Sequence, residues 1–276
     1  MKPLFMWAGG KSKMMKHYAP FMPSSLNSYS EPFFGGGAML IHVMKGYSPA
    51  LVRINDINAD IMGIYSAIKD DCANFMKFVD CHQQRYIPLS KEDRKKLFYE
   101  IREENATGYQ NWNPTEQAAV LYFLMKTAFN GIWQINKNTN NRFGTPSGLL
   151  NQKDVIYDRD NVLAWSHMMN STNCVITSND WSCVPHGDFT FMDPPYRDSF
   201  ADYNEAFSDT ELLKLIDALR ANKVTWICNR DCDDGFFDNL EVEIHKFPVT
   251  YTAGRRKKTE DGYEAKKATE VLLINR

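Results

Sequence analysis

Residues 193–196 combine a carboxylate, two prolines and an aromatic ring directly after an apolar segment. Residues 189–192, Phe-Thr-Phe-Met, predict a buried strand that ends at Asp193. Pro195 fixes the local backbone and removes a donor, so the Asp193 carboxylate and an exposed carbonyl form two rigid hydrogen-bond acceptors. Two converging acceptors suit an exocyclic amine, and Tyr196 offers a flat ring on which a base can stack. A strand-ending turn explains the prolines but not the acid and the tyrosine.

A glycine-rich turn at residues 31–38, Glu-Pro-Phe-Phe-Gly-Gly-Gly-Ala, lies between a predicted short strand and a helix. Glycine lets the backbone approach a ligand and frees amide groups at a helix N-terminus. Asp56 follows Gly37 by 19 residues, close to the roughly 20-residue offset at which an acid meets ribose hydroxyls. Such turns can serve packing alone, but with Asp56 the pattern favours a ligand that contains a nucleoside.

A second glycine pair occurs near the start of the sequence, in Trp7-Ala8-Gly9-Gly10-Lys11. The spacing is wrong for a phosphate-binding loop, because Phe5 stands where that motif requires a glycine. An aromatic residue beside Gly-Gly-Lys instead suits a cofactor with an adenine face and a carboxylate, for which Lys11 supplies the countercharge.

Strands and helices alternate around these motifs. Residues 51–55 predict a strand and residues 57–70 a helix, because apolar residues recur at helical spacing. The alternation resumes later, with strands at 174–178, 189–193 and 224–230, a helix at 208–222, and two strands that flank a basic loop, at 247–253 and 268–276. Strand–helix–strand units form parallel sheets, so the sequence predicts an α/β fold.

The pattern changes between residues 72 and 170. Charged, helix-forming stretches at 90–104 and 114–129 predict a helical insertion, the second after an Asn-Pro start. Residues 130–148, rich in Asn, Gly, Thr and Pro, predict turns and a hairpin.

Length and composition indicate an ordinary globular protein. A chain of 276 residues with 43% hydrophobic residues fits one large domain or a core with one inserted subdomain. No apolar run approaches the roughly 20 residues that span a bilayer, and the N-terminal residues do not resemble a secretory signal. We therefore expect an intracellular protein without a membrane segment.

Six cysteines are scattered along the chain without a Cys-x-x-Cys pair. Cys228 and Cys232 could be combined with His245 into a metal site, but their spacing is not a usual zinc pattern. We expect reduced, mostly buried thiols that take no part in the chemistry, and no metal.

The net charge of −2 hides a segregation of charge. Residues 1–30 and 126–153 each contain lysine or arginine and no acid, and a third basic segment runs from Arg255 to Lys267. Such runs are commonly solvated loops, but three of them leave room for one basic face that contacts nucleic acid.

These motifs, in this order, resemble the Dam-type DNA adenine-N6 methyltransferases, the alpha group of the D12 class. The resemblance covers nearly the whole chain and is strongest at residues 5–65 and 187–204. It implies a Rossmann-like class I methyltransferase sheet with helices on both faces. It also implies a catalytic domain formed by residues 1–70 and 171–276, and an inserted, mainly helical target-recognition subdomain with a β-hairpin at 71–170.

The resemblance assigns roles to individual residues. Asp193, Pro194, Pro195 and Tyr196 match the catalytic loop, which holds the amine of an adenine rotated out of the duplex. The Asp193 carboxylate would orient this amine and stabilise its developing positive charge. The matched contacts to S-adenosyl-L-methionine are Trp7, Ala8, Gly9, Gly10, Lys11, Glu31, Phe33, Gly35, Gly37, Asp56, Asp180 and Asp193.

DNA contacts are expected in the predicted hairpin and in the C-terminal basic loop, at Asn130, Ile132, Gln134, Lys137, Arg142, Arg255, Arg256, Lys257 and Lys258. Family members that read GATC have a lysine and an arginine where this chain has Met6 and Gln134. Arginine reads guanine bidentately, whereas glutamine suits adenine, so we expect a recognition sequence other than simply GATC.

The expected partner is double-stranded DNA, bound by a monomer or weak dimer, and a cognate restriction endonuclease is a candidate second partner. The expected location is the cytoplasm and nucleoid of a bacterium or of a phage-infected bacterial host. Two alternatives are a DNA-binding homologue without turnover and a methyltransferase for RNA or protein amides. Asp193 favours adenine in DNA over the second alternative, because those enzymes more often have asparagine at this position.

Overall fold

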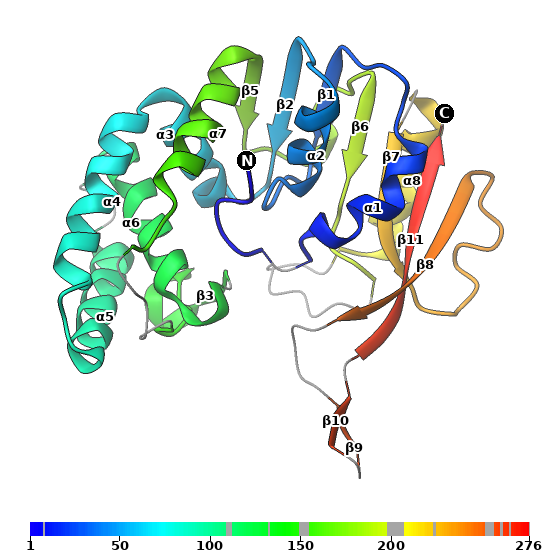
Figure 1. Cartoon of the computed structure of the whole chain (residues 1–276). Helices are drawn as coiled ribbons and strands as arrows, with labels where there is room; N and C mark the ends of the chain where they lie inside the picture. The colour runs from blue at the N-terminus through cyan, green and yellow to red at the C-terminus, as the bar shows by residue number, and fades with distance from the viewer. Residues whose placement is uncertain are drawn as a thin grey trace.

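The computed structural model describes residues 1–7, 9–108, 112–131, 133–148, 155–197, 207–222, 225–251, 257–259, 262–264 and 266–275. A seven-stranded sheet forms the centre of the molecule (Figure 1). Its strands, in spatial order, are β5 (Asn173–Thr177), β2 (Leu51–Asn55), β1 (Ser28–Glu31), β6 (Phe189–Met192), β7 (Thr225–Asp231), β11 (Lys266–Asn275) and β8 (Glu243–Tyr251).

The sheet is mostly parallel. The strands from β5 to β7 pair in parallel, and β11 pairs antiparallel with both β7 and β8. All four residues of β6 are buried, as expected for a central parallel strand covered on both faces. The chain runs from β1 outward to β2 and β5 and then returns to β6 on the other side of β1. This reversal creates a topological switch point between β1 and β6, where open α/β sheets bind ligands.

Helices cover both faces of the sheet, which confirms the predicted α/β class. On one face, α8 (Asp209–Ala221) buries Leu212, Leu215, Ile216 and Leu219 in a cluster with Met192, Ile227 and Val271. On the other face, Tyr18 of α1 (Met15–Tyr18) packs in the larger core with alternate residues of the same strands, such as Phe191 and Trp226. This larger core also includes α2 (Ala38–Gly46), α3 (Ala59–Asp70) and α7 (Arg159–Ser171).

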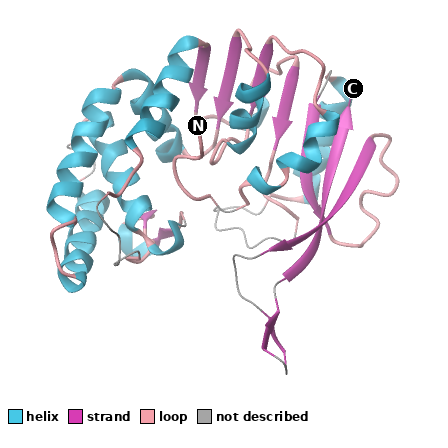
Figure 2. Cartoon of the chain, viewed as in Figure 1, coloured by secondary structure: helices cyan, strands magenta, loops and turns pink. Residues whose placement is uncertain are grey.

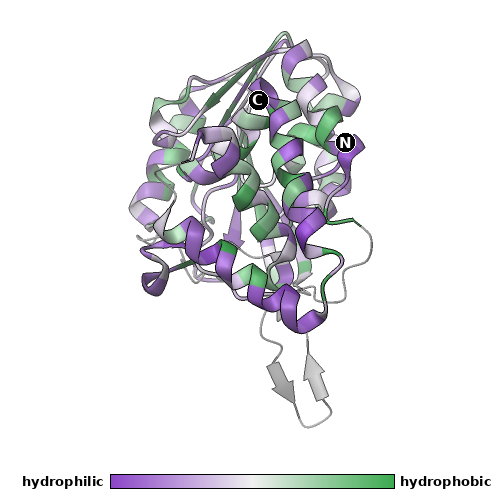
Figure 3. Ribbon diagram, turned by 90° about the vertical axis from the view of Figure 1, so that its left-hand side faces the viewer, coloured by the Kyte–Doolittle hydropathy of each residue, from purple (hydrophilic) through white to green (hydrophobic). Residues whose placement is uncertain are grey.

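The predicted helical insertion is present. It consists of α4 (Cys72–Tyr86), α5 (Lys91–Thr107) and α6 (Pro114–Thr127), grouped beyond β5 in Figure 1. Nine residues of α6 are buried, because this helix packs against α3, α4 and α5. Viewed from this side, the helices alternate hydrophilic and hydrophobic residues, as amphipathic helices do (Figure 3). The sequence pattern did not resolve α4 or α7 as separate helices.

Side-chain caps define where several helices begin. Asn58, Ser90, Asn113, Asp158 and Ser208 each accept a hydrogen bond from the backbone amide three residues later. Each cap satisfies one of the amide groups that a helix N-terminus leaves without an intrahelical partner.

The predicted hairpin between residues 130 and 148 is a short antiparallel pair. β3 (Ile135–Asn136) pairs with β4 (Arg142–Phe143), and Arg102 of α5 donates to the carbonyl oxygens of Gly144 and Thr145. The 3₁₀ helices η4 (Phe129–Gly131) and η5 (Lys137–Thr139) flank β3.

Two details near the C-terminus differ from the prediction. Part of the basic loop forms a further antiparallel pair, β9 (Lys257–Thr259) with β10 (Gly262–Glu264), which projects beyond the sheet (Figure 2). β8 begins at Glu243, four residues before the predicted strand, and contains Pro248. Proline is tolerated there because β8 is an edge strand, whose outer side needs no amide donors.

The expectation that the thiols are mostly buried is wrong. Cys174 and Cys228 are buried, Cys72 and Cys232 are half-buried, and Cys81 and Cys183 are exposed; all six are free thiols. No helix among the described residues is long and apolar enough to cross a membrane.

Gly37 and Gly63 give opposite predictions for substitution by alanine. Gly37 has a φ of +66°, and an added Cβ would lie 2.6 Å from Phe34 Cζ and 3.0 Å from Trp165 Cη2. Backbone strain and overpacking should make Gly37→Ala less stable by about 2–4 kcal/mol. Gly63 lies inside α3 with open space around it, so Gly63→Ala should gain about 0.5–1 kcal/mol. Urea denaturation of both variants measures the difference, and equal effects would contradict it.

Candidate active site

Asp193 lies at the carboxyl end of β6 and accepts hydrogen bonds on both carboxylate oxygens. Lys11 Nζ is 2.8 Å from Asp193 Oδ2, and the Cys228 thiol donates to Oδ1 at 3.0 Å. The side chains of Lys11 and Asp193 are 4% and 22% exposed, so the ion pair is buried on one side and open on the other. Burial raises the pKa of Cys228 well above its usual value, with the charge of Asp193 as the next cause. Cys228 is therefore a protonated donor that orients the carboxylate, a contact that the sequence did not reveal.

Lys11 is positioned by the turn that begins at Trp7. The Gly10 amide donates to the Trp7 carbonyl, and η1 (Lys11–Lys13) begins directly afterwards. Gly9 adopts a φ of +76°, and its carbonyl accepts from Lys11 Nζ at 2.5 Å. Burial is the largest single effect and lowers the pKa of Lys11, but the charge of Asp193, the hydrogen bond to it and the other nearby acidic groups together outweigh burial, and the net shift is upward. The ammonium also lies 4.7 Å from the centre of the Tyr196 ring, within cation–π range.

Tyr196 is held from two directions. Its hydroxyl donates to Glu270 Oε2 at 3.3 Å, and Lys11 lies over its ring. Burial raises the pKa of Tyr196 well above its usual value, so the hydroxyl remains a donor. Glu270 is 5% exposed on β11, directly before the buried apolar residues Val271–Ile274 of the same strand.

The glycine-rich turn makes room for Trp7. A Cβ on Gly35 would lie 2.4 Å from Trp7 Nε1, and one on Gly36 would lie 3.1 Å from Trp7 Cβ. Gly35 also has a φ of +47°, which favours glycine. The glycines therefore allow the indole to lie directly against the turn, in addition to any ligand that approaches it.

Asp56 joins the end of β2 to this turn. Its Oδ2 accepts the Gly35 amide at 2.9 Å and its Oδ1 accepts the Asn58 amide at 3.0 Å. Burial raises the pKa of Asp56, and these two amide donors act in the opposite direction. Each oxygen retains a lone pair for a further donor, as two vicinal hydroxyls would require.

Glu31 ends β1 and is 2% exposed. It accepts the Tyr29 hydroxyl at 2.7 Å and the amide of Leu40 in the first turn of α2. Burial is the main reason that the pKa of Glu31 is raised well above its usual value, and the charges of Asp193 and Asp56 raise it further. The carboxylates of Glu31, Asp193 and Asp56 therefore lie close enough to act on one another, with Lys11 paired to Asp193, and the site suits a cationic ligand.

An aromatic group lies next to the glycine turn. The rings of Phe33 and Trp181 are inclined by 26° with centroids 6.5 Å apart, and Phe207 meets Phe33 edge-on. The Asp180 carboxylate accepts from the Ser182 amide and hydroxyl, so it caps η6 (Trp181–Cys183). These hydrogen bonds lower the pKa of Asp180.

Of the residues that the structure describes, the predicted catalytic and cofactor residues are brought together, whereas the predicted DNA-binding residues lie on the hairpin and in β9. Asn130 in η4 has a φ of +53°, Lys137 lies in η5, and the Gln134 carbonyl accepts the Gly144 amide. Arg142 in β4 lies 3.7 Å from Asp60. Lys257 and Lys258 lie in β9. Ala8, Ile132, Arg255 and Arg256 lie outside the described residues.

Met6 is adjacent to the hairpin despite its distance in sequence. A Cβ on Gly131 would lie 3.1 Å from Met6 Cβ, and the Met6 side chain is 65% exposed. Met6 therefore lies beside Gly131, three residues before Gln134, the other position at which we expect a difference from the GATC-reading pattern.

The family is established by comparison of the sequence with family models. The model of the D12 class N6 adenine-specific DNA methyltransferases matches residues 7–246. The chain belongs to this family.

The chain aligns with its relatives along most of their lengths. The chain is 25% identical over 290 residues to the type II methyltransferase M1.LlaDCHI of Lactococcus lactis subsp. cremoris, and the alignment covers 100% of this chain and 95% of that relative. It is 29% identical over 230 residues to M.MjaIII of Methanocaldococcus jannaschii, covering 78% of each. It is 27% identical over 237 residues to M.CviBI of Paramecium bursaria Chlorella virus NC1A, covering 81% and 80%. The chain is an adenine-specific DNA methyltransferase, and DNA is its substrate.

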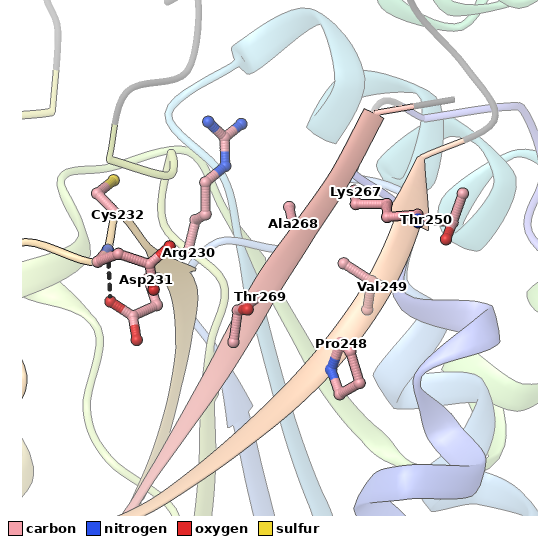
Figure 4. A pocket seen from close by; sticks show the side chains of 10 residues that line it. Arg230, Asp231, Cys232, Pro248, Val249, Thr250, Lys267, Ala268 and Thr269 are labelled. Carbon is pink, nitrogen blue, oxygen red and sulfur yellow. Dashed lines mark hydrogen bonds between the residues drawn. The ribbon is translucent and has the colours of Figure 1, made fainter. Parts of the chain in front are cut away.

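A hollow of about 640 Å³ lies beside the methyltransferase site but contains none of its predicted catalytic or cofactor residues. It is lined from the end of β7 and from β8 and β11, with Arg230 and Lys267 as its cations (Figure 4). Among the described residues, no group of three His, Cys, Asp or Glu side chains is arranged to hold a metal ion.

Lys11→Met should destabilise the methyltransferase, because it leaves the half-buried Asp193 carboxylate without its ion-pair partner. Breaking a buried pair costs about 3–5 kcal/mol, and the 22% exposure of Asp193 places the expected loss near the lower end. Adding Asp193→Asn should recover part of this loss, as measured by urea denaturation. Lys214→Met, which breaks an exposed pair with Glu211, is the control, and an equally small effect of both lysine variants would disprove the role of Lys11.

Proposed function

We propose that Asp193, Pro194 and Tyr196 receive the target adenine, while Glu31 and Asp56 hold S-adenosyl-L-methionine beside them. The observation that carries this assignment is that the carboxylates of Glu31, Asp56 and Asp193 act on one another at the ends of β1, β2 and β6, with Lys11 paired to Asp193. The exocyclic amine of adenine is engaged in base pairing within a duplex, so the target base must rotate out to reach Asp193.

The residues of the site fit the proposed cofactor in charge and in shape. Asp56 offers a free lone pair on each oxygen to the ribose hydroxyls, and Glu31 offers a buried carboxylate to the ammonium of the methionine part. The rings of Phe33 and Trp181 are suited to an adenine face. When bound, S-adenosyl-L-methionine supplies a methyl group on a positively charged sulfur, and this carbon–sulfur bond breaks as the bond to N6 forms.

The contribution of the protein to transfer is orientation and charge. Asp193 is held by Lys11 and Cys228 and retains acceptor capacity for one N–H of the amine, while the Pro194 carbonyl would accept the other. Developing positive charge on N6 is stabilised by the Asp193 carboxylate. Pro195 keeps the loop rigid, and Tyr196 supplies the stacking surface.

DNA would lie along the carboxyl edge of the parallel strands. This edge faces the side on which the β3–β4 hairpin and the β9–β10 pair are found (Figures 1 and 2). We infer that residues 71–170 form a target-recognition part and that residues 1–70 and 171–276 form a catalytic part. Contacts to bases are assigned to the hairpin with Asn130, Ile132, Gln134, Lys137 and Arg142. Contacts to phosphates are assigned to the loop with Arg255, Arg256, Lys257 and Lys258.

The recognition sequence is proposed to differ from GATC, because Met6 and Gln134 replace the lysine and arginine of the GATC-reading pattern. Bacterial and viral relatives support action on cytoplasmic, nucleoid DNA. A monomer or weak dimer on DNA is proposed, with a cognate restriction endonuclease as functional partner.

Expression in a bacterium without adenine methylation, followed by modification-sensitive sequencing of its DNA, tests the function. The wild type should produce N6-methyladenine in one sequence context other than GATC. Asp193→Ala should reduce methylation by about 100-fold or more, as expected when a transition-state-stabilising group is lost. Its affinity for duplex DNA should stay within about threefold, because phosphate contacts supply most of the affinity.

Asp217→Ala is the matched control, since Asp217 is an exposed acid on α8 that pairs with Arg220. Near-normal methylation by Asp193→Ala would remove Asp193 from the mechanism. Modification confined to GATC would instead overturn only the proposed recognition sequence.

Cofactor binding should release a proton and strengthen as pH rises. The raised pKa of Glu31 means that the free protein holds this proton above the usual range for glutamate, and a bound ammonium favours the ionised form. Calorimetry of S-adenosyl-L-methionine binding in buffers of different ionisation enthalpy measures the release. Glu31→Gln should abolish it and weaken binding about tenfold or more, the value of a charge-assisted hydrogen bond. Glu211→Gln on α8 is the control, and a pH-independent wild-type affinity would exclude Glu31.

A further inference from the structure

Arg197 directly follows the catalytic loop and is tied to two separate carboxylates. Its Nε and Nη2 donate to Asp209 at 2.7 and 2.9 Å, and its Nη1 and Nη2 donate to Asp234 at 2.9 and 2.6 Å. The guanidinium also lies 4.1 Å from the centre of the Phe236 ring. The planar guanidinium makes two bidentate interactions and stacks on an aromatic ring. The ammonium of a lysine could not reproduce this set of contacts.

The cluster of Arg197, Asp209 and Asp234 combines a nearly buried cation with two partly exposed acids. The Arg197 side chain is 11% exposed, although both acids reach solvent. Hydrogen bonds to Asp234 and then Asp209 raise the pKa of Arg197, and the Arg197 hydrogen bond is the main reason that the pKa of Asp234 falls to about 2. Arg197 and Asp234 therefore keep their charges throughout the pH range in which DNA is stable.

The two acids belong to different elements. Asp209 is the first residue of α8, where the helix N-terminus favours a negative charge. Asp234 lies in the turn after β7, which is shaped by Gly235 at a φ of +75° and by an Asp234 carboxylate that accepts the Phe236 amide. Arg197 thus joins the end of the catalytic loop to α8 through Asp209 and to the turn after β7 through Asp234.

The backbone of Arg197 is fixed as well. Its amide donates to Asn229 Oδ1 at 3.0 Å, and Asn229 is fully buried in β7. Tyr196 therefore lies between a peptide held by Asn229 and a hydroxyl held by Glu270. The ring on which the base would stack has its direction set from both ends.

We propose that Arg197 is a positioning residue for methyl transfer, which holds Asp193 and Tyr196 in the productive geometry through Asp209 and Asp234. The inference rests on the proposed roles of Asp193 and Tyr196. It assigns to Arg197 no contact with adenine or cofactor. Misplacement of a reacting group by about 1 Å can cost about 100-fold in rate, so a change at Arg197 should appear in the rate of transfer rather than in ligand binding.

Arg197→Lys tests the proposal, because it keeps the charge and loses the two bidentate interactions. Transfer of a tritiated methyl group to adenine-unmethylated genomic DNA should show kcat reduced by about 10- to 100-fold. The dissociation constant of S-adenosyl-L-methionine should change by less than about threefold, because Glu31 and Asp56 are untouched. Arg159→Lys on α7, which alters a pair with Asp80 away from the site, is the control and should keep the wild-type kcat.

Asp209→Asn and Asp234→Asn provide a second route if Arg197→Lys folds poorly, since both acids are partly exposed. Each should lower kcat per folded molecule, and combining Asp234→Asn with Arg197→Lys should add little to the lysine variant alone. Folded fraction is measured by near-ultraviolet circular dichroism. A kcat per folded molecule equal to that of the wild type in all three single variants overturns the inference. Absence of methyl transfer by the wild type instead overturns the proposed function.

Discussion

Lys11 places its ammonium 2.8 Å from Asp193 in a space where the carboxylates of Glu31 and Asp56 also act. Lys11 alone does not neutralise these three acids. A buried charge is costly unless it is paired and hydrogen-bonded, so the remaining negative charge needs hydrogen-bond donors from the protein. The surrounding backbone reflects this constraint. The amides of Gly35 and Asn58 point at Asp56, and the Tyr29 hydroxyl points at Glu31. The geometry of three strand ends is thus organised around a charge imbalance that a cationic ligand would relieve.

The same site is constrained sterically by Trp7. Its indole lies so close to Gly35 that this residue could not carry a Cβ without displacing the ring, and a Cβ on Gly36 would crowd Trp7 Cβ. The turn that leads to Lys11 and the turn that leads away from Glu31 are therefore fitted to each other. Residues far apart in sequence have to be compatible as a pair, and the glycines serve this fit as well as any ligand.

Much of the fold was predictable because apolar runs, and the residues that begin and end helices and strands, are local features of the sequence. The strands that end at Asn55 and Met192, and the helices after Gly37 and Ser208, follow from spacing that a single sequence displays. Contacts between distant segments were not predictable in this way. Lys11 was assigned to a cofactor carboxylate, whereas its nearest carboxylate is Asp193, because a charge pattern alone does not select between two acids. Glu270 and Arg197 were missed for the same reason. Glu270 directly precedes the apolar residues Val271–Ile274, and a lone acid next to such a run is a weak signal that the sequence did offer.

The position of β11 has a consequence for synthesis. β11 lies between β7 and β8, although both of those strands precede it in the chain. A nascent polypeptide that has emerged only as far as Tyr251 contains both neighbours of β11 but not the strand that joins them. The Tyr196–Glu270 contact is likewise absent until β11 is made. Sheet closure and assembly of the proposed base-stacking site therefore coincide, so translation intermediates on the ribosome are expected to be inert toward DNA.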